Sequence, residues 1–254
     1  SLLLYAIQQE PVYPEGVGIS RALTPAEIAW IAANPPGPGG RAATSPPSGP
    51  VHCVAEYEPM EGILIAWEGT SGQNTVLAKM AKHVTTTGNG KVYCVVDSTS
   101  EQNSASNTIS NQGADMNNVE FIVKNTDTIW IRDYGPRYIY QGDCRSIIDH
   151  DYNRPRNNDN AFPSFFSSHK NQAWYDHDLE HGGGNYHLDA LGYSYATKLI
   201  LNENGNKSEA QIKQIFQDFQ NLNTTILDAF PTSVDSTQHL DMWMQIIGDQ
   251  TVVI

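Results

Sequence analysis

The chain has little cysteine, little positive charge and no long apolar run. Its 254 residues include three cysteines, Cys53, Cys94 and Cys144, and none lies in a C-x-x-C pair, so we expect no structural zinc site. Lys and Arg number 15 against 28 Asp and Glu, and the net charge of −13 argues against nucleic acid or an anionic membrane as partner. No apolar stretch approaches the ~20 residues that cross a bilayer.

The remaining composition is that of a globular protein in which strands and helices alternate. Hydrophobic residues make up 39% and charged residues 17%, which is enough for a sizeable core. β-branched runs predict strands at 62–67, 91–97, 119–124 and 224–230, and apolar spacing predicts helices at 75–84 and 209–219. Residues 98–117 predict a short helix with loops, and Gly142-Asp143 predicts a hairpin turn. The pattern indicates α/β modules of roughly 60 residues, about three complete and a fourth only opened.

Residues 1–54 differ in character from the rest. Thr24 and Pro25 are suited to the N-cap and first position of a short helix. The segments 35–40 and 46–50 are rich in proline and glycine, which is linker composition. We therefore expect an extended N-terminal arm with a short helix over residues 1–54 and a larger domain over residues 55–254.

The stretch 125–136 is the first candidate for chemistry. Its β-branched and aromatic core, 128–131, predicts a buried strand, with Arg132 and Asp133 at the strand end. A carboxylate beside the face of Trp130 suits a flat cation, because the ring attracts the charge and the carboxylate accepts two N–H donors. The alternative is a structural ion pair between Arg132 and Asp133.

A second candidate is His239 with Asp241. In an extended segment both side chains point to the same side, where a histidine can transfer protons while a carboxylate binds a cation. A plain surface pair is the alternative. A third candidate is Arg154 and Arg156, which flank a proline and can clamp a carboxylate or phosphate. Their alternative is a solvated loop, paired with Asp149, Asp151 and Asp159.

The segment 180–187 contains three consecutive glycines, which indicate tight packing or close approach to a ligand. It does not follow a strand as G-x-G-x-x-G, so we expect no dinucleotide site. The spacing of metal-ligating residue types here resembles that of a metal site: His181, His187, Asp176, Asp178 and Glu180. We nevertheless predict neither a metal site nor a cofactor. Binding of hard ions by the acidic residues stays open.

These motifs resemble those of one known family. Glu56-Tyr-Glu-Pro-Met-Glu-Gly, Trp130-Ile-Arg-Asp-Tyr-Gly-Pro, Gly183-Gly-Asn and His239-Leu-Asp occur in the order seen in the agmatine deiminase and bacterial peptidylarginine deiminase family. The resemblance implies an α/β pentein fold, a five-bladed propeller, of which this chain holds about three and a half modules. It implies that Trp130 and Asp133 line a guanidinium pocket, that Asp241 is the second carboxylate and that His239 is the general acid/base. Arg154 and Arg156 then resemble the pair that holds the carboxylate of a C-terminal arginine.

The implied activity is citrullination: an amidine hydrolase converts peptidyl-arginine to citrulline and ammonia through a cysteine thiolate. The family's nucleophilic cysteine lies in the last module, and none of Cys53, Cys94 and Cys144 matches it. We therefore expect this chain alone to be inactive, the thiol coming from a C-terminal segment or from a second chain of a cleaved precursor. A truncated protein, an agmatine deiminase and a non-catalytic module that binds arginine or cationic peptides remain alternatives. The resemblance to the secreted branch favours a secreted or periplasmic location.

Overall fold

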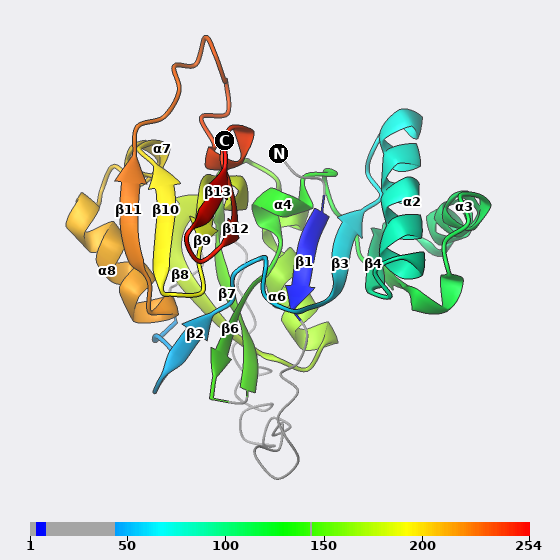
Figure 1. The fold of residues 1–254 in the computed structure, drawn as a ribbon, viewed down its shortest axis with the longest axis horizontal. Helices are drawn as coiled ribbons and strands as arrows, with labels where there is room; N and C mark the ends of the chain where they lie inside the picture. The colour runs from blue at the N-terminus through cyan, green and yellow to red at the C-terminus, as the bar shows by residue number, and fades with distance from the viewer. Residues whose placement is uncertain (1–3, 9–43, 143) are drawn as a thin grey trace.

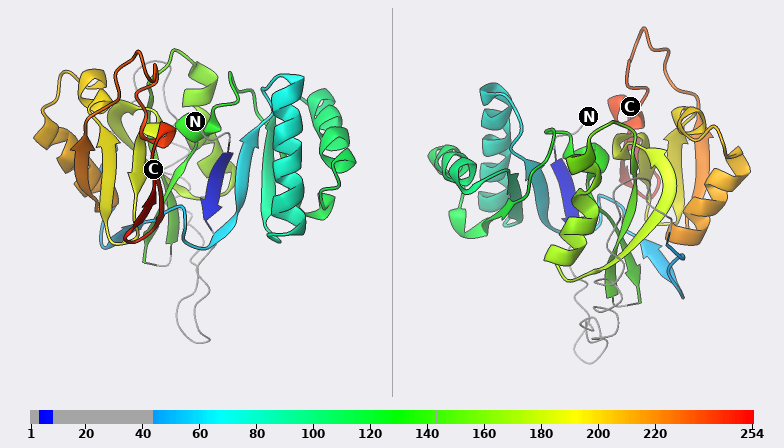
Figure 2. Two further views of the ribbon diagram at one scale, coloured as in Figure 1. Left: turned by 45° about the horizontal axis from the view of Figure 1, so that its top comes forward. Right: turned by 180° about the vertical axis from the view of Figure 1, so that it is seen from behind.

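The computed structural model describes residues 4–8, 44–142 and 144–254. In these residues the strands form three sheets and one hairpin, with helices on the two outer flanks and also between the sheets (Figure 1). Figure 2 shows from two further sides that α2 and α3 cover one flank of the molecule and α8 the opposite flank. The helix predicted after Thr24 lies outside the described residues.

The first sheet has the strand order β1-β3-β4-β5. β1 (Leu4–Gln8) is antiparallel to β3 (Met60–Ala66), and β3, β4 (Lys91–Val96) and β5 (Val119–Val123) are parallel. α2 (Ser71–Thr86) begins with a capping box in which Thr70 and Gln73 satisfy each other's N–H groups. α3 (Thr99–Asn111) is one longer helix where a short helix with loops was predicted. The strands predicted at 62–67, 91–97 and 119–124 are confirmed as β3, β4 and β5.

The second sheet has the order β2-β6-β7-β8. β2 (Val51–Cys53), β6 (Arg137–Gln141) and β7 (Cys144–Tyr152) are antiparallel neighbours, and β8 (Ala173–His181) runs parallel to β7. The predicted hairpin is confirmed: Gly142 has a φ of +57°, which glycine adopts without strain. α5 (Asn157–Asn160) and α6 (Phe162–His169) connect β7 to β8.

The third sheet contains β9 (Tyr186–Leu188), β10 (Tyr193–Thr197) and β11 (Asn223–Leu227). α7 (Leu199–Glu203) and α8 (Glu209–Gln220) lie between β10 and β11 in the chain. The predicted α8 is confirmed, and Ser208 caps it as expected. β12 (Gln245–Gly248) and β13 (Thr251–Val253) form the hairpin.

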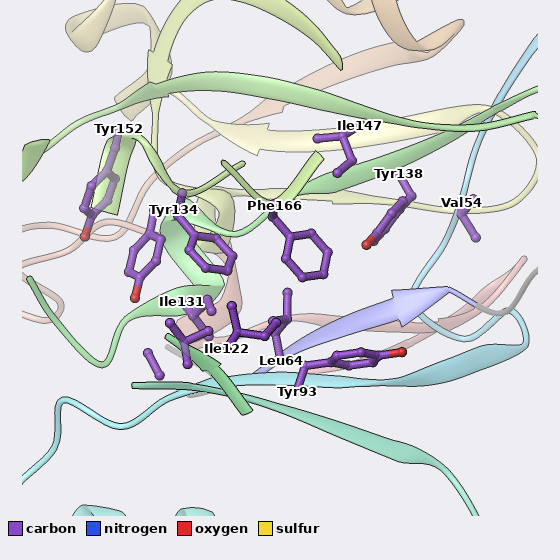
Figure 3. Packing of buried hydrophobic residues seen from close by; sticks show 13 residues of the cluster. Val54, Leu64, Tyr93, Ile122, Ile131, Tyr134, Tyr138, Ile147, Tyr152 and Phe166 are labelled. Carbon is purple, nitrogen blue, oxygen red and sulfur yellow. The ribbon is translucent and has the colours of Figure 1, made fainter. Parts of the chain in front are cut away.

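The predicted strand at 128–131 is wrong, because this segment leads into the helical turn α4 (Ile131–Tyr134). Ile131 and Tyr134, three positions apart, enter the same core as Leu64 and Phe166 (Figure 3), as residues on one face of a helix do. Ile129 is buried in a different cluster. Ile129 and Ile131 are thus buried in two separate cores, and together they give the alternating burial pattern that is typical of a strand.

Strands β1 and β2 lie within residues 1–54 and join the first and second sheets. The domain boundary after residue 54 stays a prediction. Of the helices in the described ranges, none is long and apolar enough to cross a membrane.

Candidate active site

Three side chains singled out in the sequence meet over the glycine segment 182–184. Asp133 comes from α4, whereas His239 and Asp241 come from the residues before β12. Nδ1 of His239 lies 3.5 Å from Oδ1 of Asp133. The Gly184 N–H donates a hydrogen bond of 3.1 Å to the same oxygen. Residues more than a hundred positions apart therefore share one buried site.

The glycines are required because site side chains occupy the space of a β-carbon. A Cβ on Gly182 would lie 2.8 Å from Cε1 of His239. A Cβ on Gly184 would lie 2.7 Å from Oδ2 of Asp241 and 2.8 Å from Oδ1 of Asp133. The two carboxylates therefore approach one point on a bare backbone, and a larger residue would push them apart. The predicted tight packing at these glycines is confirmed.

His239 and Asp241 do not lie in an extended segment, so that premise is wrong. Residues Leu240–Met242 form a 3₁₀ turn, and Leu240 is fully buried with Met244 and Ile246. Burial of Leu240 fixes the turn. The residues on either side of it then both face the glycine segment.

The surroundings of Asp133 favour its ionised form. Burial opposes the charge, since the residue is only 7% exposed. His239, the Gly184 N–H and the charge of Arg132 outweigh burial and hold the pKa of the carboxyl below its ordinary value. Asp133 is therefore a carboxylate at neutral pH.

Asp241 has the opposite tendency. Burial, together with the negative charge of Asp133, raises the pKa of its carboxyl, and the charges of Arg132 and His239 offset this only in part. Two carboxylates this close repel each other when both are ionised. A planar cation between them relieves the repulsion and gives each carboxylate N–H donors. The arrangement suits a guanidinium ligand.

Arg132 pairs with Glu56 rather than with Asp133, so the alternative of an Arg132–Asp133 ion pair is wrong. Nη2 of Arg132 also lies 3.0 Å from Nε2 of His187. Gln245 donates to the other oxygen of Glu56 at 2.9 Å. These contacts tie α4 to β9 and β12 from the side away from its core residues.

Trp130 is half-buried and packs against the two cores that meet at α4. Its carbonyl accepts the Asp133 N–H at 2.9 Å. The indole and the carboxylate therefore belong to one turn of chain. Its role against a ligand cation stays a prediction.

Arg154 and Arg156 follow β7 near this site. Arg156 donates a 2.9 Å hydrogen bond to the Tyr152 hydroxyl and lies over its ring. Burial and then the charge of Asp133 raise the pKa of Tyr152 to about 12, against the effect of Arg156. The charges of Asp133 and Arg156 therefore act on the Tyr152 hydroxyl in opposite directions. Arg154 donates to the Asn153 carbonyl at 2.8 Å.

Among the residues that the structure describes, Asp149, Asp151 and Asp159 do not pair with these arginines, but Arg154 is exposed, as the solvated-loop alternative expects. Asp159 accepts the N–H groups of Asp127 and Thr128, and Asp149 accepts from the Trp174 indole. No carboxylate in the described ranges pairs with Arg154 or Arg156. The solvated-loop alternative therefore stays open for Arg154, whose charge also offsets part of the rise in the pKa of Glu203.

Sequence reasoning missed His150. Its Nε2–H donates to the Asp133 carbonyl at 2.9 Å, and its ring stacks on His181 at 4.0 Å. Burial lowers the pKa of His181 well below its usual range, so that ring is neutral. A single histidine inside a strand carries no signal in the sequence that distinguishes it from a core residue.

His181 and His187 do not join one cluster with the neighbouring acids: His181 stacks on His150, and His187 contacts Arg132. In the described part of the chain, carboxylate oxygens within 4.8 Å of one another come from Glu68, Asp97 and Glu101. Asp97 and Glu101 accept backbone N–H groups there, which gives them a structural role.

Cys53 and Cys94 are buried in hydrophobic cores. Burial raises the pKa of the Cys53 thiol to about 12 and that of Cys94 further still, so neither is a thiolate at neutral pH. Cys144 begins β7 and Tyr152 ends it. At the rise of a strand, they are roughly 25 Å apart.

Two solved structures resemble this chain in fold. An agmatine deiminase from C. jejuni superimposes with a TM-score of 0.63 at 19% identity, over 80% of this chain and 62% of that one. An agmatine deiminase of Enterococcus faecalis gives 0.69 at 18% identity, over 82% of this chain and 63% of that one. The chain thus spans about three fifths of each, and at these identities the likeness concerns the α/β fold.

The family model for Porphyromonas-type peptidyl-arginine deiminases matches residues 52–254. This range includes every candidate site residue discussed above. The chain therefore belongs to the Porphyromonas-type peptidyl-arginine deiminase family.

Proposed function

We propose that this chain forms the guanidinium-binding part of a deiminase that acts on peptides ending in arginine. The observation that carries the proposal is the meeting of Asp133, His239 and Asp241 on a backbone without side chains. Asp133 and Asp241 accept the N–H groups of the guanidinium, and Trp130 lies against its face. The fold proposed for the complete protein is the five-bladed pentein ring.

The reaction follows from these positions. A cysteine thiolate attacks the central guanidinium carbon, which the two carboxylates hold in place. His239 transfers a proton to the departing nitrogen, which leaves as ammonia. Water then attacks the carbon of the covalent adduct, and citrulline leaves as the thiolate re-forms. Citrulline is neutral, so the two carboxylates hold it less tightly than arginine.

We propose that the thiol comes from a segment or second chain outside these 254 residues. The high pKa of the Cys53 and Cys94 thiols and the distance of Cys144 support this origin. Intact-mass spectrometry of the native protein under denaturing conditions tests it. A second cysteine-containing polypeptide is expected, and a lone mass of 28.0 kDa would favour a module that binds arginine without reacting.

The choice of substrate rests on Arg154 and Arg156, which form no direct ion pair with a carboxylate in the described part of the chain. Agmatine has no carboxylate, so it would leave both guanidinium groups unpaired. Ammonia release from a peptide with C-terminal arginine and from agmatine, measured side by side, decides between the two substrates. Faster turnover of agmatine would make this an agmatine deiminase.

A further inference from the structure

Glu203 ends α7 at a fixed position. The next residue, Asn204, accepts the Glu180 N–H at 2.9 Å and donates to the Glu180 carbonyl at 2.8 Å. Through these two bonds the Asn204 side chain pairs with the backbone of Glu180 in β8 and holds the end of α7 on that strand. Glu203 is therefore carried by a rigid support rather than by a free loop end.

From the end of α7, the Glu203 side chain contacts Asn153, the residue before Arg154. Its Oε1 accepts a hydrogen bond from the Asn153 side chain, and the Asn153 carbonyl accepts from the guanidinium of Arg154. The Asn153 N–H points to the His181 carbonyl. Asn153 is thus held on both sides, and Glu203 is the side-chain partner that links it to α7.

Burial of the Glu203 carboxylate at this position costs free energy. Its Oε2 is buried and has no hydrogen-bond partner in the described residues, which is uncommon for a carboxylate. Burial raises the pKa of Glu203 to about 7, a rise that Glu180 reinforces and that Asn153, His239 and Arg154 offset only in part. Glutamine would make the same hydrogen bond without a charge. The charge itself therefore needs an explanation.

We propose that Glu203 is a positioning residue for Arg154, which sets the preference of the site for ligands with a free carboxylate. The hydrogen bond to Asn153 holds Arg154 where a ligand carboxylate arrives. The negative charge of Glu203 acts electrostatically on Arg154 and His239 and limits how strongly a second carboxylate binds. This inference rests on the proposed function, because it assumes that Arg154 meets the carboxylate of the substrate.

The test uses two ligands that differ only in that group, Nα-acetyl-arginine and its carboxamide. The protein is used as isolated from its source, with any further segment that it carries. Dissociation constants come from calorimetry, or from KM where the ligand turns over. Glu203→Gln keeps an oxygen that accepts from Asn153, Glu203→Ala removes it, and Asn153→Ala breaks the same bond from the other side. Glu180→Gln is the control for loss of a nearby charge.

The acid is expected to bind Glu203→Ala about tenfold more weakly than Glu203→Gln, the loss expected for one hydrogen bond to a polar partner. The carboxamide should bind both variants equally. In the wild type, the preference for the acid should fall severalfold from pH 6 to pH 8, and Glu203→Gln should remove that dependence.

Equal weakening of acid and carboxamide in Glu203→Ala and Asn153→Ala would overturn the proposal, as would identical affinities of the two Glu203 variants for the acid. A wild-type protein that binds acid and carboxamide equally would instead refute the arginine clamp, and the role of Glu203 with it. If Glu203→Ala does not fold, Asn153→Ala gives the same comparison. An effect of Glu180→Gln as large as that of Glu203→Gln would assign the result to general charge.

Discussion

Replacing Gly184 with alanine adds one methyl group where the two carboxylates meet. The new Cβ would lie 2.7 Å from Asp241 and 2.8 Å from Asp133, whereas ordinary van der Waals contact begins near 3.4 Å. Each carboxylate would have to retreat by roughly 0.6 Å or more. This displacement weakens the hydrogen bonds from a guanidinium to both carboxylates, and a hydrogen bond to a charged group contributes about 1.5–3 kcal/mol. We therefore expect affinity for a guanidinium ligand to fall between about 10-fold and 100-fold.

The matched control is Gly72→Ala in α2, where a Cβ meets nothing within 4 Å. This change should stabilise the protein by about 0.5–1 kcal/mol through the helix propensity of alanine. Calorimetric titration with an arginyl ligand measures affinity, and urea unfolding measures stability. Gly184→Ala with wild-type affinity and unchanged stability would refute the placement of both carboxylates at this glycine.

Further predictions concern three side chains. Asp133→Asn should lose about 2–5 kcal/mol of guanidinium binding, because a buried charged partner disappears, while circular dichroism and the melting temperature stay close to wild type; an unchanged affinity would remove Asp133 from the site. Arg156→Lys should weaken binding of C-terminal arginine about tenfold and leave agmatine unaffected, because lysine lacks the planar fork; steady-state KM values for the two substrates check this. Glu203→Gln should change how the stability of the protein depends on pH. Burial raises the pKa of Glu203 from 4.5 to about 7. The protonated carboxyl of the wild type therefore stabilises the folded state fully below pH 4.5, and this stabilisation is lost as the pH rises through 7. Urea unfolding should show the variant gaining about 2–3 kcal/mol over wild type between these pH values; parallel curves would show that Glu203 titrates normally.

Most of the strands and the helices α2 and α8 were predictable because their patterns are local. Ser208 caps α8 as expected, and the hairpin at Gly142 follows from its turn residues. The segment before Asp133 was not predictable in this way. Ile129 and Ile131 alternate as in a strand, but they are buried in two different cores, and a sequence does not show which core receives a residue.

The candidate site was predictable in its members but not in its geometry. Asp133, His239 and Asp241 were chosen as separate motifs, and only the fold brings them to the same glycine. Glu203 and His150 gave no local signal, since their importance arises from partners far away in the chain, Asn153 and the Asp133 carbonyl. Long-range pairing of this kind depends on the arrangement of the sheets.

The single helical turn α4 makes stability and ligand recognition inseparable in one short segment. Its Ile131 and Tyr134 are fully buried in the central core, while Arg132 and Asp133 between them serve the site. A substitution at any of these four positions therefore harms folding, recognition or both. Few substitutions in this segment are expected to be neutral. In the segment after β7, Arg156 contacts Tyr152 and Thr128, whereas Arg154 is exposed. New substrate preferences are more accessible at Arg154, because its side chain can change without disturbing the residues that hold the guanidinium.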